Sequence, residues 1–229
     1  MKKNRLTIIL LCILCVLVIV GGAMQNDFIG LAKAKVEHVK ELFASVTGDS
    51  LDYEGHIVGN VYTNEGLNIK VEAKDGFYFL TDEQQKEKKK IANEKLGRDA
   101  DYEGLAEIFK EFDMAGEGKS LTFSKMYVSD SVAQKYKREG VRADDLSPAL
   151  DLQLQSMGYT DKEKTIDHLL GEDVPSTTYK MVQGTQGIEH DIYLKSIIAV
   201  RKDYALYFIA TSVGDDNFEE LLGMVSDLN

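Results

Sequence analysis

Cysteine is nearly absent from this chain of 229 residues, since only Cys12 and Cys15 are present. Both lie inside one apolar stretch near the amino terminus, so the rest of the chain has no disulfide, no thiol nucleophile and no thiolate metal ligand. The C-x-x-C spacing would suggest a redox pair, but in an apolar segment we interpret both residues as small hydrophobic side chains. The folded part must therefore be stabilised by a hydrophobic core alone.

Positive charge is also scarce, because 27 Lys and Arg stand against 38 Asp and Glu, a net charge of −11. The first 26 residues hold three of the positive charges and no negative ones. The remainder therefore has 24 positive and 38 negative charges, a net charge of −14. A surface of this sign repels phosphate backbones and anionic lipids, so nucleic acid is excluded as a partner of the folded part.

Histidine is limited to four residues, three of which fall in the predicted folded part or at its edge: His56, His168 and His190. None lies in a His-x-x-x-His or His-Glu-x-x-His arrangement, and Gly-x-Ser-x-Gly is missing. On a strand, Glu189 and Asp191 would share one face and His190 the other, which separates these side chains as metal ligands. The sequence thus predicts no catalytic residue, no metal site and no cofactor.

A positive head and an apolar segment are what the amino terminus does contain. Lys2, Lys3 and Arg5 precede the uncharged residues 6–26, a pattern that directs a chain to export and keeps its head in the cytoplasm. Residues 1–26 are therefore a signal peptide, cleaved after Ala23, or a membrane anchor that spans through residues 6–26. Both alternatives place the rest of the protein outside the cytoplasm, anchored to the cytoplasmic membrane or secreted.

Hydrophobic periodicity divides the exported part into three segments. Residues 27–48 have apolar positions at helical spacing and predict an amphipathic stalk helix. Residues 49–59 are rich in turn formers and are interpreted as a linker. Residues 60–229 then form the extracytoplasmic domain.

Alternating and helical patterns predict the elements of that domain. Residues 67–73 alternate as a half-buried strand, Asp75 and Gly76 form a turn before an apolar strand at 77–80, and Thr81 caps a helix over 82–96. The remaining predictions are a hairpin of 109–114 with 121–128, strands at 164–170 and 177–183, and helices near 102–108, 131–138 and 148–157.

The end of the chain carries the clearest pattern. Residues 188–200 and 204–213 predict two long strands paired antiparallel near the middle of a sheet. Residues 217–228 predict a closing helix with Asp216 and Glu219 as its capping box. Together these elements predict an α+β domain, an antiparallel sheet with helices packed on it, after an N-terminal apolar helix.

Three motifs allow a functional and a structural interpretation. Residues 116–120 (GEGKS) imitate the end of a phosphate-binding loop, but Asp113 stands where that loop needs glycine, so we interpret them as a hairpin turn. Residues 214–217 (GDDN) offer oxygens to Ca²⁺ or cap a helix, and capping is preferred. The basic run 86–90 (KEKKK) is interpreted as the solvated face of a helix, with contact to an acidic envelope polymer as the alternative.

Two stretches resemble the PsbP-like family of exported bacterial and plastid proteins. They are residues 60–77 (NVYTNEGLNIKVEAKDGF) and 204–222 (YALYFIATSVGDDNFEELL), which are similar to that family's opening strand and to its last strand and final helix. The opening strand of the family usually ends in Pro-x-Gly-Trp, whereas Lys74-Asp75-Gly76-Phe77 stands here. The resemblance implies an α/β/α sandwich with a non-catalytic binding or assembly role, and it transfers no functional residue.

The sequence therefore favours a non-enzymatic protein of the cell envelope that binds a protein partner or an envelope component. Two alternatives remain: a carrier of a small apolar ligand, and a hydrolase that uses His168 or His190. A deep apolar pocket would favour the carrier, and a cleft joining one of these histidines to a serine and a carboxylate would favour the hydrolase.

Overall fold

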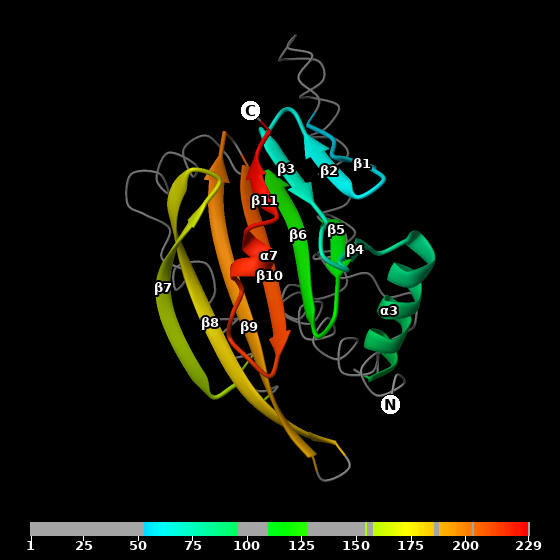
Figure 1. The fold of residues 1–229 in the computed structure, drawn as a ribbon, viewed down its shortest axis with the longest axis vertical. Helices are drawn as coiled ribbons and strands as arrows, with labels where there is room; N and C mark the ends of the chain where they lie inside the picture. The colour runs from blue at the N-terminus through cyan, green and yellow to red at the C-terminus, as the bar shows by residue number, and fades with distance from the viewer. Residues whose placement is uncertain are drawn as a thin grey trace, which may run out of the picture.

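A computed structural model describes residues 53–95, 110–127, 154, 158–185, 188–202 and 204–228 of the chain. The described residues form two antiparallel sheets that pack face to face, together with two helices (Figure 1). The predicted leader with Cys12 and Cys15, the stalk at 27–48 and the helix at 102–108 lie outside these residues. So do the predicted helix at 131–138 and, apart from Leu154, the one at 148–157.

The large sheet has seven strands in the order β4-β5-β6-β10-β9-β8-β7, and every neighbouring pair is antiparallel. Its strands are β4 (Tyr78–Phe79), β5 (Lys110–Ala115), β6 (Lys119–Tyr127), β7 (Asp161–Leu169), β8 (Glu172–Thr185), β9 (Ile188–Arg201) and β10 (Tyr204–Val213). The predicted pairing of the last two long apolar runs is confirmed, because Tyr204 lies opposite Arg201 and Val213 opposite Ile192. β10 stands at the centre of the order, as expected for the most apolar strand.

The small sheet has four strands in the order β1-β2-β3-β11. They are β1 (His56–Val58), β2 (Val61–Asn64), β3 (Ile69–Glu72) and β11 (Val225–Asp227). β1 falls within the stretch that we interpreted as a linker. Figure 1 shows this sheet, with β11 and the short helix α7 (Glu219–Leu222), in front of the upper and central parts of the large sheet.

Aromatic side chains fill the space between the two sheets. Phe112, Phe123 and Phe208 from three adjacent strands of the large sheet are fully buried, and their rings contact in sequence at 5.5 and 4.7 Å between centroids. Tyr62 of β2 packs on Phe112 at 4.8 Å and donates a hydrogen bond of 2.8 Å to Glu111. Aromatic rings in offset or tilted contact stabilise a fold by more than the burial of their apolar area alone. This cluster therefore favours one arrangement of the two sheets relative to each other.

The other face of the large sheet buries a second apolar cluster. Leu154, Tyr159, Tyr179, Ile192 and Leu194 belong to it. Strands β9 and β10 therefore bury apolar residues on both faces, which explains why their sequences contain continuous hydrophobic runs rather than alternation.

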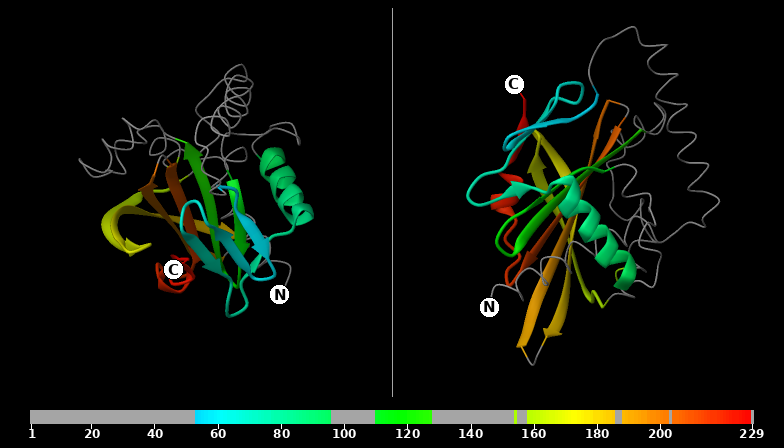
Figure 2. Two further views of the ribbon diagram at one scale, coloured as in Figure 1. Left: turned by 90° about the horizontal axis from the view of Figure 1, so that it is seen from above. Right: turned by 90° about the vertical axis from the view of Figure 1, so that its right-hand side faces the viewer.

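The helix α3 (Asp82–Lys95) lies where the sequence predicts it, beside the β4 and β5 end of the large sheet (Figure 2). Its start is a capping box: the Gln84 amide donates to the Thr81 hydroxyl at 3.3 Å, and the Thr81 amide donates to the Gln84 side chain at 2.9 Å. Among the described residues, neither helix has the length and apolar character that crossing a membrane requires.

The expected fold class is wrong, because the described residues are dominated by strands and do not form a sheet covered by helices. The predicted N-terminal apolar helix falls on residues outside the described part, and the α/β/α sandwich implied by the PsbP-like resemblance is not what the described residues form. The small sheet covers one face of the large sheet, and it joins three short strands near the start of the domain to β11 near the end of the chain. The alternation at 67–73 predicted one of these strands, but strands of three or four residues give little periodic pattern, so helices were expected as the covering layer.

The predicted closing helix at 217–228 is also wrong in its length. Only Glu219–Leu222 is helical, and the chain then turns at Gly223 and pairs as β11 with β3, where Val225 lies opposite Val71. Phe218 and Leu221 are buried by the short helix and Val225 by the strand. Pairing with β3 satisfies backbone groups that a longer helix would satisfy internally, and it buries the same apolar residues.

A turn at Asp75 and Gly76 is confirmed, since both residues have positive φ and Phe77 donates its amide to Lys74 at 2.9 Å. The strands on either side of this turn nevertheless belong to different sheets, because β3 pairs with β2 and β11 while β4 pairs with β5. The turn therefore carries the chain from the small sheet to the large one.

Candidate binding groove

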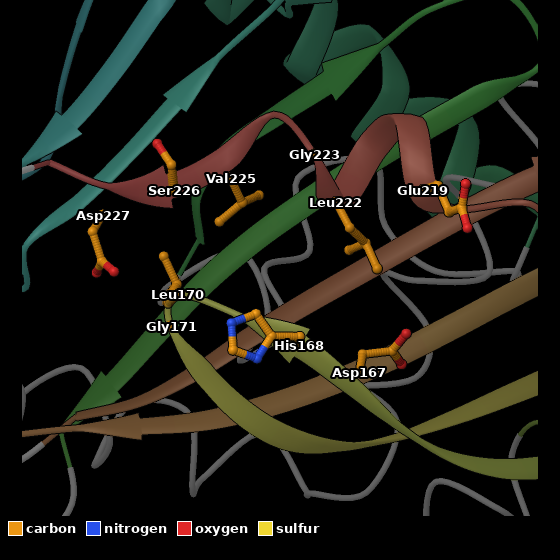
Figure 3. Close-up of a pocket in the computed structure, with 10 residues that line it drawn as sticks. All are labelled: Asp167, His168, Leu170, Gly171, Glu219, Leu222, Gly223, Val225, Ser226 and Asp227. Atoms are coloured by element: carbon orange, nitrogen blue, oxygen red, sulfur yellow. The ribbon is translucent and has the colours of Figure 1, made fainter.

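An open groove lies where the hairpin of β7 and β8 meets the carboxyl-terminal segment α7–β11 (Figure 3). Its volume is about 470 Å³. One wall is formed by Asp167 and His168 at the end of β7 and by the turn Leu170–Gly171. The opposite wall is formed by Glu219, Leu222, Gly223, Val225, Ser226 and Asp227.

The floor of the groove is apolar and its rim is polar. Leu170 and Val225 are buried and belong to the core between the sheets, and Leu222 packs against that core. Around them stand Asp167, Glu219 and Asp227, together with His168 and Ser226. A groove of this composition suits a ligand that has both an apolar part and hydrogen-bonding or cationic groups.

Arg201 fixes one end of the groove by joining three segments. Its guanidinium pairs with Asp227 of β11 at 2.7 Å and donates to the backbone oxygens of Leu67 and Asn68 at 3.2 and 2.9 Å. It also donates to the backbone oxygen of Leu170 in the β7–β8 turn. Planar guanidinium donors in several directions suit such a junction, so the groove wall is preorganised at this end.

A second polar network holds the wall at Asp167. Lys195 of β9 pairs with this carboxylate at 2.8 Å, and the buried Ser176 hydroxyl donates to it. Ser176 also shares a hydrogen bond of 2.7 Å with Thr165. The Asp167 side chain is 19% exposed, so one part of it is tied to the protein while another borders the groove.

The structure places His168, but not His190, in this groove. His168 Nδ1 lies 3.0 Å from Asp173, yet the side chains of the pair are 70% and 77% exposed. No serine hydroxyl of the described residues lies within hydrogen-bond distance of His168, although Ser226 stands on the opposite wall (Figure 3). His190 lies on β9 opposite Gln183. The geometry therefore brings together no Ser–His–carboxylate arrangement around His168.

The glycine-rich segment 116–120 lies in the β5–β6 hairpin, with Gly118 at a φ of 74°. Asp113 just before it is fully buried and forms ion pairs with Lys88 of α3 at 2.7 Å and Lys110 at 3.0 Å. Burial alone would raise the pKa of Asp113, but the two ammonium groups and a hydrogen bond from Thr122 outweigh it and lower the pKa to about 2.

Lys88 corrects the interpretation of residues 86–90 as a solvated face. Its side chain is only 3% exposed and reaches Asp113, whereas Lys86 and Lys90 are exposed. Within the basic run, Lys88 therefore holds α3 against β5, while Lys86 and Lys90 face solvent.

Residues 214–217 act as local hydrogen-bond acceptors at the start of α7. Asp215 accepts from the amide of Asn217 at 3.1 Å, and Asn217 accepts from the amide of Glu219 at 2.9 Å. Asp216, the residue we expected in the capping box, has no such role. Among the described residues, no group of three or more His, Cys, Asp or Glu side chains is placed to hold a metal ion.

Several residues that shape the groove carried no signal in the sequence. Arg201 falls between the predicted strands 188–200 and 204–213, and Lys195 falls inside the first of them. A polar residue inside an otherwise apolar run is a weak signal of a buried partner, and here it applies to Lys195. Leu170 adopts a φ of 54°, a backbone conformation that is uncommon for leucine and that no sequence pattern predicts here.

No protein-family model matches this chain, and no curated protein matches its sequence. Among solved structures, one similar chain is LpqN of Mycobacterium tuberculosis, described as involved in cell envelope biogenesis. The TM-score is 0.33 and the sequence identity 8%, over 68% of this chain and 75% of LpqN. A TM-score this low supports no conclusion about the fold or function of this chain, and the resemblance to PsbP-like proteins stays a prediction from two short motifs.

Proposed function

We propose that this chain is a non-enzymatic protein of the cell envelope that binds a protein partner at the groove between β7–β8 and α7–β11. The observation that carries the proposal is a preorganised, open groove with an apolar floor and an acidic rim. Its two walls are tied to the sheets by Arg201 and Lys195 rather than left as mobile loops. A rigid, partly apolar recess open to solvent is what a protruding side chain of a partner needs.

The same observations count against the two alternatives. A carrier of a small apolar ligand needs an enclosed apolar pocket, but Phe112, Phe123 and Phe208 occupy the space between the two sheets. A hydrolase needs a base held against its nucleophile, and the exposed pair of His168 and Asp173 does not meet a serine. The location rests on the sequence, because Lys2, Lys3 and Arg5 precede the apolar residues 6–26.

Site-specific photo-crosslinking in intact cells that produce the chain tests this proposal. A photoreactive amino acid at Ser226 in the groove should give a discrete crosslinked protein. The same amino acid at Lys90, exposed on α3 at the other side of the large sheet, is the matched control and should give none. Equal products from both positions, or none from Ser226, would contradict binding at the groove.

A further inference from the structure

Strand β7 is an edge of the large sheet and borders the groove. One side of β7 pairs with β8, and within the described ranges no strand pairs with its other side. Leu169 and Glu172 flank the two-residue turn Leu170–Gly171, whose φ values are both positive. In such a hairpin the flanking residues exchange both backbone hydrogen bonds, and the bonding side alternates along the strand. Ile166 and His168 therefore direct their backbone N–H and C=O groups away from β8.

The half of β7 that adjoins the groove has no lysine to guard the edge of the sheet. Sheet edges are commonly guarded by lysine side chains, and β7 has the exposed Lys164 before the half that adjoins the groove. From Thr165 to Leu169 there is no lysine, and Ile166 is 74% exposed. This half thus offers unpaired backbone groups together with an apolar side chain.

The charge of the groove selects what can lie beside that edge. Asp167 and Asp227 are paired with Lys195 and Arg201, but Glu219 on the opposite wall has no ion pair in the described part of the chain. With the whole chain at −11, the groove attracts a cationic group and repels a second copy of its own acidic surface.

From this arrangement we infer that the groove recognises an extended peptide segment that adds as a strand to the outer edge of β7 and places a Lys or Arg side chain near Glu219. The inference rests on the proposed function and names its mode of recognition. Backbone hydrogen bonds to the edge supply affinity that is independent of sequence, and the basic side chain supplies specificity. The apolar floor at Leu170, Leu222 and Val225 receives the aliphatic stem of that side chain.

A selection followed by binding measurements tests the inference on the full chain in detergent. The probe is a display library of random peptides of about 12 residues, long enough to cover the nine residues of β7. Enriched peptides should carry a Lys or Arg among β-branched residues. Ile166→Pro removes an outward N–H without removing a bond to β8, and should weaken binding at least about tenfold. Ile166→Thr keeps the N–H and is the matched control, with a change below about threefold.

Two further measurements test the inference even if the Ile166→Pro variant does not fold. Glu219→Lys should weaken the basic peptides at least about fivefold, whereas Glu94→Lys on α3 should not. On the unmodified protein, methylating the amides along one edge of a selected peptide should abolish binding, and methylating the other edge should not.

The inference is overturned if the enriched peptides lack a basic residue, if no peptide is enriched, or if both methylated peptides bind equally. It is also overturned if the chain dimerises through β7 and loses the dimer in Ile166→Pro. The two proposals can fail separately. A crosslinked partner at Ser226 that is unaffected by Ile166→Pro would leave protein binding in place and remove strand addition, whereas the absence of any crosslink at Ser226 would remove the proposed function itself.

Discussion

At the scale of single residues, a buried carboxylate between two lysines decides how α3 is held. Asp113 is enclosed by Lys88 and Lys110, whose side chains are 3% and 6% exposed. Neither ammonium group can return to water without moving the helix or the strand. The charge of Asp113 is therefore needed to balance cations that are already buried.

Replacing Asp113 by asparagine keeps the size of the side chain and removes that balance. We expect Asp113→Asn to lower the free energy of unfolding by about 3–5 kcal/mol, as for a buried pair that loses one partner. Urea unfolding measures the change. Asp173→Asn, at a carboxylate that is 77% exposed, is the control and should change it by no more than about 0.5 kcal/mol. Similar losses in both variants would contradict the role of burial.

The same carboxylate should affect how the free energy of unfolding changes at acid pH. Its pKa is lowered from 3.8 to about 2 in the folded protein, so the unfolded chain binds a proton more readily. The stabilisation from Asp113 is fully present above pH 4 and is lost as the pH falls toward 2. Unfolding measured between pH 2 and 5 should show a shallower decline in Asp113→Asn than in the unmodified protein. Parallel declines would contradict this assignment.

At the scale of elements, the sequence predicted those whose pattern is local. The strands 188–200 and 204–213 and the helix 82–96 follow from long apolar runs and from the cap at Thr81. The alternation at 67–73 also predicted one strand of the small sheet, but the pairing of β3 with β11 could not be predicted, because Asp227 lies opposite Ile69, 227 − 69 = 158 residues earlier. The groove depends on that distant pairing, so its residues share no motif.

Substitution of Arg201 tests whether this side chain holds β11 in the small sheet. Arg201→Leu keeps the apolar stem and removes the ion pair with Asp227 and the hydrogen bonds to three backbone oxygens. We expect a loss of about 2–4 kcal/mol in the free energy of unfolding, since hydrogen bonds from a charged donor contribute about 1.5–3 kcal/mol. Hydrogen exchange of the amides of β11 should accelerate more than that of β10.

The matched control is Lys74→Ala, which removes an ion pair to Glu72 from a side chain that is 53% exposed. It should change stability by no more than about 0.5 kcal/mol. Protection of β11 that survives in Arg201→Leu would show that strand pairing with β3 alone suffices.

At the scale of the whole molecule, the export segment predicted at residues 1–26 leads to a testable topology. Protease added to intact cells should degrade residues after 26, because the positive head keeps only the amino terminus inside. Immunoblotting of the folded part measures the loss, and a cytoplasmic protein is the control. Survival of the folded part until the cells are lysed would contradict export.

The late position of β11 also constrains how the protein is made. β3 is synthesised early, but the strand that covers its free edge comes about 150 residues later, which takes roughly 10–30 s at ordinary rates of synthesis. During this interval Ile69 and Val71 belong to a sheet that is not yet complete. The nascent chain thus has an unpaired strand edge on β3, which can aggregate, until β11 has been synthesised. Because the sequence predicts export, we expect this chain either to be kept unfolded during translocation or to be shielded by a chaperone until the last strand closes the sheet.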